Sequence, residues 1–149
     1  MAKAIAVGRP VVAEADLIVP SLSEQVRILA VQLADDDPGP ERDLIVHADL
    51  HYDNVLAGKR EAWLAIDPRA RRGSPEIAVA ELLWTRADEV ADGAGFVDLL
   101  AAVVRAADLD PERARAWALA RSLDYLRWGF AHELTEDPPR CARIIRALI

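Results

Sequence analysis

Cysteine is almost absent from this sequence of 149 residues, and long apolar runs are absent altogether. The single cysteine, Cys141, has no partner for an intramolecular disulfide or for a cysteine-ligated zinc site, which agrees with a reducing compartment. Every apolar run is shorter than the ~18 residues that a membrane span needs, and no basic segment followed by an apolar one marks a signal peptide at Met1. We therefore expect a soluble, cytoplasmic protein without a membrane partner.

Positive charge is also in short supply. The chain has 18 basic against 25 acidic residues, a net charge of -7, which would repel the phosphates of a nucleic acid. We expect no nucleic-acid partner, and an acidic chain suits a cationic small molecule, although many proteins are acidic for solubility alone. A hydrophobic content of 52% indicates a folded globular protein. The length suits one domain, so we expect residues 1–149 to form a single domain.

Apolar residues recur at helical spacing in most of the chain. The predicted helices cover residues 21–34, 74–87, 96–107, 111–134 and 137–149. The first opens with a capping box of Ser21 and Glu24, and the third follows a break at residues 92–95. One face of the fourth helix carries Trp117, Arg121, Tyr125 and Trp128, and the last should bury Cys141, Ile144, Ile145, Leu148 and Ile149.

Strand patterns are confined to the middle of the chain. Residues 44–47 form an apolar strand, and residues 54–66 form a hairpin that turns at residues 58–61. A basic loop, residues 69–73, follows the hairpin, and the arm over residues 1–18 has no clear period. The predicted fold class is mainly α with a small antiparallel β-hairpin.

A dense polar cluster directly follows the apolar strand. It contains His47, Asp49, His51, Asp53 and Asn54, and the chain then returns at once to an apolar run, so the loop should be tightly held. Asp67 follows the second strand of the hairpin, and because it precedes a proline we expect extended geometry there. Two strand ends and one loop should therefore converge on one site.

The spacing His-x-Asp-x-x-x-x-Asn, followed after the hairpin by Ile-Asp, matches the catalytic loop and metal-binding aspartate of kinase-type phosphotransferases. The wider segment, HADLHYDNVLAGKREAWLAIDPRARRGSPEIAVAELLW, closely resembles the aminoglycoside and hydroxyurea phosphotransferase family, which includes the streptomycin kinases. The resemblance is strong over His47 to Trp84 and weaker elsewhere.

This resemblance implies ATP-dependent transfer of a phosphoryl group to a hydroxyl of an aminoglycoside-type antibiotic such as streptomycin. Asp49 would be the catalytic base, Asn54 and Asp67 would hold Mg²⁺ against the ATP phosphates, and His47 would support the loop from behind. Arg69, Arg71 and Arg72 would either neutralise phosphate charge or form a solvated turn. His51 and His132 have no partner at ligand spacing, and we interpret both as structural.

The sequence departs from the family pattern at three positions. Ala48 replaces a glycine, Ser74 an aspartate, and Ala78 an acidic residue that helps to hold the catalytic loop. In addition, no glycine-rich phosphate loop precedes His47, and neither Lys3 nor Lys59 is placed to contact nucleotide. The chain thus resembles the C-terminal lobe of a kinase-like fold, with the N-terminal nucleotide lobe absent. We expect it to be inactive by itself, with an apolar surface that is covered by the arm before Pro20 or by a second copy in a homodimer.

Two alternative functions follow from other features. Asp49-Leu50-His51 resembles the opening motif of the polymerase-and-histidinol-phosphatase type of metal-dependent hydrolase, but that chemistry needs further histidines and only His132 remains outside the cluster. The second alternative is a non-catalytic helical remnant of the kinase family that acts in binding or assembly.

Overall fold

The computed structural model describes residues 18, 20–35, 39 and 44–149. Its α-helices are α2 (Pro20–Asp35), α3 (Val79–Trp84), α4 (Gly93–Ala107), α5 (Pro111–Ala131) and α6 (Asp137–Leu148). Short 3-10 turns are η1 (Tyr52–Asn54), η2 (Pro75–Ala78) and η3 (Ala87–Glu89), and the strands are β1 (Leu44–Val46), β2 (Val55–Ala57), β3 (Trp63–Ala65) and β4 (Arg71–Gly73). The predicted mainly helical character is confirmed. The arm predicted over residues 1–18 lies, apart from Ile18, outside the described residues.

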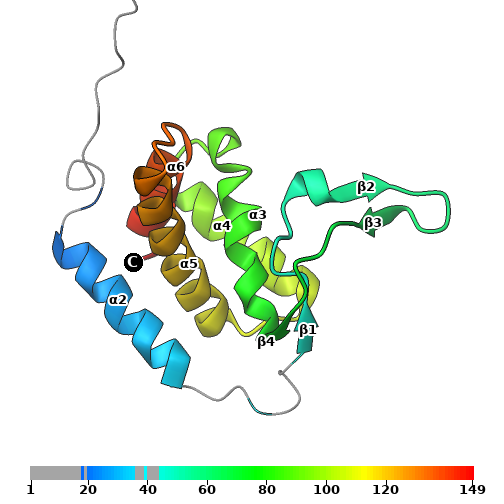
Figure 1. Ribbon diagram of the computed structural model, residues 1–149, viewed down its shortest axis with the longest axis horizontal. Helices are drawn as coiled ribbons and strands as arrows, with labels where there is room; N and C mark the ends of the chain where they lie inside the picture. The colour runs from blue at the N-terminus through cyan, green and yellow to red at the C-terminus, as the bar shows by residue number, and fades with distance from the viewer. Residues whose placement is uncertain (1–17, 19, 36–38, 40–43) are drawn as a thin grey trace, which may run out of the picture.

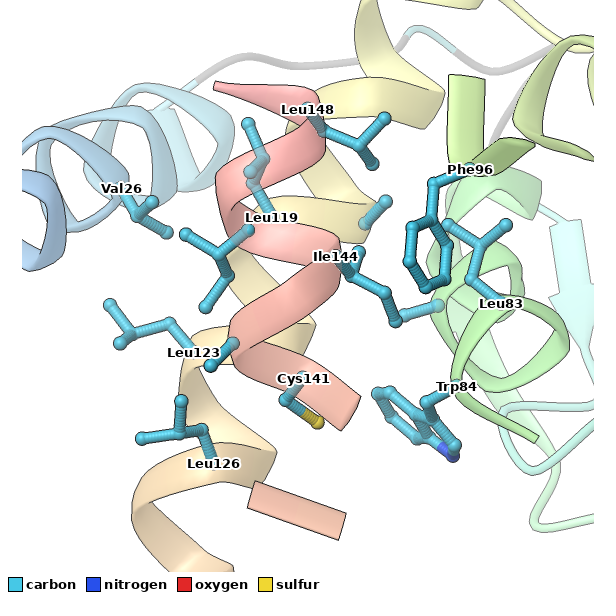
Figure 2. Packing of buried hydrophobic residues seen from close by; sticks show 14 of the residues in the cluster. Val26, Leu83, Trp84, Phe96, Leu119, Leu123, Leu126, Cys141, Ile144 and Leu148 are labelled. Atoms are coloured by element: carbon cyan, nitrogen blue, oxygen red, sulfur yellow. The ribbon is translucent and has the colours of Figure 1, made fainter. Parts of the chain in front are cut away.

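The helices pack into one body, and the β2–β3 hairpin extends away from it (Figure 1). Helix α5 lies inside this body because its sequence caps well and its apolar residues occur on more than one face. Asp110 accepts a hydrogen bond from the Arg113 amide at 2.9 Å, and Pro111 occupies the first turn. Buried side chains from α2, α3, α4 and α6 meet those of α5 in one core (Figure 2).

Both pairs of strands are antiparallel. Val55 lies opposite Ala65 in the β2–β3 hairpin, which confirms the predicted hairpin. Leu44 lies opposite Gly73, so β1 pairs with β4. The prediction of a basic loop over residues 69–73 was therefore wrong for residues 71–73, which form β4. A lone strand leaves its backbone N–H and C=O groups without partners, and β4 supplies those partners to β1.

The single helix predicted over residues 74–87 was also wrong. The segment forms η2, α3 and η3 in succession, and tertiary contacts explain why the helix does not continue. Arg143 donates to the carbonyls of Ala87 and Val90, which hold the chain away from a helical path. Helix α4 begins at Gly93, because the Asp92 carboxylate caps it by accepting from the Gly95 amide at 3.0 Å.

Two predictions at the ends of the helical body were wrong. Helix α2 begins at Pro20, so Ser21 lies inside the helix and not at the cap, and Glu24 forms an ion pair with Arg27 at 2.7 Å. Ile149 is 39% exposed because it lies beyond the last turn of α6. The other four residues predicted to be buried in that helix, Cys141, Ile144, Ile145 and Leu148, are buried.

The strands expose large apolar side chains. Ile45 on β1 is 75% exposed and Trp63 on β3 is 69% exposed, with Leu44, Leu56 and Ile66 exposed to a smaller degree. An apolar surface was expected where a nucleotide lobe would pack. These side chains are exposed and apolar, and their packing against such a lobe stays a prediction. None of the helices in the described part of the chain is long and apolar enough to span a membrane.

Candidate active site

A cleft of about 650 Å³ lies between the loop that follows β1 and the helices α3, α5 and α6. Its volume falls within the range of small-molecule sites. Asp49 lines the cleft from the loop, Glu81 and Trp84 from α3, and Arg121 and Tyr125 from α5. Residues that are far apart in the sequence thus form one concave surface around Asp49.

Hydrogen bonds close the loop that carries Asp49. The Asp49 carbonyl accepts from the His51 amide at 3.1 Å and from the Asn54 side-chain nitrogen at 2.9 Å. Ala48 has a φ of 52°, in the left-handed region that favours glycine. The positive φ that glycine would favour at this position is therefore present, and alanine adopts it at some cost in backbone strain.

Ile66 joins the loop to the segment that contains Asp67. Its amide donates to the Asn54 carbonyl at 2.9 Å, and its carbonyl lies 2.8 Å from Nε2 of His47. Asp67 itself has a φ of 52° and lies two residues beyond the end of β3, so the expectation of extended geometry was wrong. Aspartate adopts this conformation more readily than most residues, and the Ile66 contacts hold the chain directly before it.

The candidate residues differ in exposure. The Asp49 side chain is 28% exposed, and Oδ2 forms an ion pair with Nε of Arg69 at 3.1 Å. Arg69 and Arg71 line the cleft beside it. Asn54 is buried and Asp67 is exposed, and neither lines the cleft. The structure thus places Asp49 at the cleft wall. Asn54 is joined through its carbonyl to the amide of Ile66, the residue before Asp67.

The donor chemistry of Asn54 and Asp67 fits Mg²⁺, which prefers oxygen ligands and keeps several waters. The Asn54 side-chain nitrogen donates to the Asp49 carbonyl, and this bond leaves the amide oxygen, the atom that would bind a metal, uninvolved. Within the part of the chain that the structure describes, no three His, Cys, Asp or Glu side chains form a metal-binding group. A cage made by the protein alone is not found there.

An ion pair between α3 and α5 was not predicted as part of the site. Oε1 of Glu81 accepts from Arg121 at 2.6 Å, and the Glu81 side chain is only 3% exposed. Glu81 stands alone among the apolar residues of α3, and Arg121 falls on the face of α5 noted in the sequence. One sequence signal could have revealed this ion pair: a single acidic residue in an apolar helical segment, together with a basic residue on an aromatic face of another helix.

Aromatic rings form a row beside this ion pair. Ring centroids are 4.6 Å apart for Trp84 and Tyr125, 5.5 Å for Tyr125 and Trp128, and 4.1 Å for Trp128 and His132. The Tyr125 hydroxyl donates to Asp137 at 2.9 Å. Burial and the neighbouring Asp137 carboxylate raise the pKa of Tyr125 to about 12, so the hydroxyl stays protonated at neutral pH.

Comparison with known proteins identifies the family of this chain. Residues 16–129 match the family described as aminoglycoside/hydroxyurea antibiotic resistance kinase. The chain belongs to this family. It is 49% identical over 115 residues to hydroxyurea phosphotransferase of Kitasatospora aureofaciens, covering 76% of this chain and 31% of the relative.

Two further relatives are streptomycin 6-kinases. The chain is 38% identical over 117 residues to streptomycin 6-kinase of Streptomyces griseus, and 34% identical to streptomycin 6-kinase of Streptomyces glaucescens; each match covers 74% of this chain and 37% of the relative. The chain thus spans about a third of the length of these kinases. No solved structure matches it. The family resemblance identified from residues 47–84 is confirmed.

Proposed function

We propose that this chain is the acceptor-binding lobe of an antibiotic-resistance phosphotransferase that transfers a phosphoryl group from ATP to a hydroxyl of an aminoglycoside. The observation that carries the proposal is the position of Asp49, a partly exposed carboxylate at the wall of a cleft large enough for a small-molecule acceptor. The names of the relatives supply the class of substrate, and the cleft supplies the place for it.

Asp49 would accept the proton of the attacking hydroxyl. A carboxylate can do so only within hydrogen-bond reach of the acceptor, and the closed loop holds Asp49 facing the cleft. Asn54 and Asp67 would hold Mg²⁺, which neutralises phosphate charge when bound. His47 would keep these two residues in place through Ile66. Most of the ATP site would lie in the part of the relatives that this chain does not match, as in a kinase-like fold with two lobes.

The Arg69 side chain forms an ion pair with Asp49. The ion pair at 3.1 Å is mostly exposed on the arginine side, and an exposed ion pair is worth little free energy, so Arg69 can leave when phosphate or acceptor arrives. Arg69 and Arg71 would then neutralise charge on the transferred phosphoryl group.

Cleft size favours an aminoglycoside over hydroxyurea as the acceptor. Hydroxyurea is far smaller than a cleft of about 650 Å³, whereas a ring-containing antibiotic fills a site of this volume. The charges in the cleft wall are mostly paired with one another, so cation attraction alone does not define the substrate.

The experiment is a kinase assay on a chimera in which this chain replaces the matching segment of the Streptomyces griseus streptomycin 6-kinase. Asp49→Asn should lower the turnover of streptomycin by ~10²-fold or more while leaving the unfolding temperature unchanged. Asp98→Asn is the matched control, because Asp98 is an exposed residue of α4 that does not line the cleft. Full activity of Asp49→Asn would refute the role of Asp49, and an inactive parent chimera would favour a non-catalytic remnant.

A further inference from the structure

The ion pair between Glu81 and Arg121 leaves hydrogen-bonding capacity unused. One hydrogen bond, from a terminal guanidinium nitrogen to Oε1, holds the pair, whereas an arginine and a carboxylate often form two in parallel. Oε2 of Glu81 and Nε of Arg121 are both buried and have no hydrogen-bond partner in the part of the chain that the structure describes. One acceptor and one donor therefore remain at the same place in the cleft wall.

The chemistry of these two atoms restricts what can satisfy them. A carboxylate oxygen only accepts hydrogen bonds, and a guanidinium nitrogen only donates them. A cationic group of a ligand would satisfy Glu81 alone, and an anionic group would satisfy Arg121 alone. A pair of neighbouring hydroxyls satisfies both, because one hydroxyl donates to Oε2 and the other accepts from Nε.

The surroundings of the pair suit a saturated ring that carries hydroxyls. Trp84, Tyr125 and Trp128 line the same cleft, and the C–H faces of such a ring pack well on aromatic side chains. The acidic groups of the wall are balanced by basic ones, as in the pairs Asp49–Arg69 and Asp137–Arg140. A cleft with balanced charge favours a neutral, polar portion of a ligand.

We propose that Glu81 and Arg121 form a subsite for two adjacent hydroxyls on a saturated ring of the acceptor, a cyclitol or a sugar ring of an aminoglycoside. The inference rests on the proposed function and makes it more specific, since hydroxyurea has no such pair of hydroxyls. Both residues line the cleft, and the Arg121 side chain, 32% exposed, is the more accessible of the two.

The test is calorimetric titration of the 149-residue chain with streptomycin, with myo-inositol as a neutral cyclitol, and with hydroxyurea. Glu81→Gln keeps the size of the side chain but removes the charged acceptor, and it should weaken streptomycin and myo-inositol binding by about tenfold or more. Arg121→Lys keeps the positive charge but lacks the Nε donor, and it should weaken both to a similar degree. Asp124→Asn is the matched control with unchanged binding, because Asp124 is 77% exposed, contacts Arg121 and does not line the cleft.

The outcomes separate this subsite from the proposed function. Equal streptomycin binding by the parent chain and both variants would overturn the subsite and leave the aminoglycoside assignment standing. Binding of myo-inositol that depends on Glu81, without binding of streptomycin, would support the subsite and overturn that assignment. If neither streptomycin nor myo-inositol binds, the subsite is overturned, and water satisfies the two buried atoms. If Glu81→Gln fails to fold, as its unfolding temperature would show, Arg121→Lys decides.

Discussion

Nε2 of His47 lies 2.8 Å from the carbonyl oxygen of Ile66, so one imidazole links the end of β1 to the end of β3 across 19 residues of sequence. A carbonyl oxygen only accepts, so Nε2 carries the hydrogen of this bond. The amide of Ile66 donates a second hydrogen bond, to the carbonyl of Asn54. The loop that contains Asp49 and the segment that contains Asp67 are thereby fixed to each other by backbone groups of a single residue.

Removal of this imidazole should loosen the link. His47→Ala is expected to lower the free energy of unfolding by about 1 kcal/mol, and to speed hydrogen exchange of the Ile66 amide. Urea denaturation and exchange measured by mass spectrometry would check both. His132→Ala is the control, because its ring contacts the carbonyl of Trp128 within its own helix, 2.8 Å away. Unchanged exchange at Ile66 in His47→Ala would contradict the proposed support.

Ala48 carries backbone strain that glycine would relieve. Its φ of 52° is unfavourable for any side chain with a Cβ atom, so Ala48→Gly should raise the free energy of unfolding by up to about 1 kcal/mol. Ala57→Gly in β2 serves as the control and should lower it, because glycine there only adds freedom to the unfolded chain. Urea denaturation of both variants decides, and a loss of stability in Ala48→Gly would show that the strain is absent.

Local patterns predicted much of the fold. The cap at Asp110, the hairpin of β2 and β3, and the buried face of α6 all depend on residues close together in sequence, and all three are present. The strand at Arg71–Gly73 was missed because its partner, β1, is distant in sequence and its own residues are basic. The break after α3 was missed; the carbonyls that follow it are bonded by Arg143, which comes from α6 and is distant in sequence.

The candidate site shows the same division between local and distant information. Asp49 and Asn54 were identified from one short loop, and Asp67 from the strand after it. The opposite wall of the cleft was missed, because Glu81 and Arg121 meet across 40 residues and belong to different helices. Their contact could not be found from spacing within either helix.

Glu76 joins the start of the α3 segment to the start of α5. It is fully buried, its Oε2 accepts from the Ser74 hydroxyl, and its Oε1 accepts from the Asp110 amide at 3.1 Å. Glu76→Ala would leave these donors without an acceptor and open a cavity, so the free energy of unfolding should fall by about 2 to 4 kcal/mol. Glu61→Ala at the exposed hairpin tip should change it by less than about 0.5 kcal/mol. Equal, small effects in urea denaturation would show that the Glu76 contacts contribute little.

The pKa of Tyr125 should lie well above that of an ordinary tyrosine. Burial and Asp137 raise its pKa from about 10 to about 12, which means that the folded chain holds the phenol proton more tightly than the unfolded chain. The stability that this contributes is fully present below pH 10 and is lost as the pH rises towards 12. Tyr125→Phe loses the hydrogen bond to Asp137, so it should be less stable than the parent at pH 8, and the difference should shrink between pH 10 and 12.

Phenolate absorbance near 295 nm, recorded by stopped flow before the chain unfolds, measures this titration directly. Tyr125→Phe retains Tyr52 alone, so the difference between parent and variant isolates Tyr125. Asp137→Asn is the control that separates the two causes: the pKa should fall but stay above 10, since burial is the larger one. A difference curve centred on pH 10 in the parent would contradict the burial of this hydroxyl beside Asp137, and with it the closed arrangement of the aromatic row in the cleft.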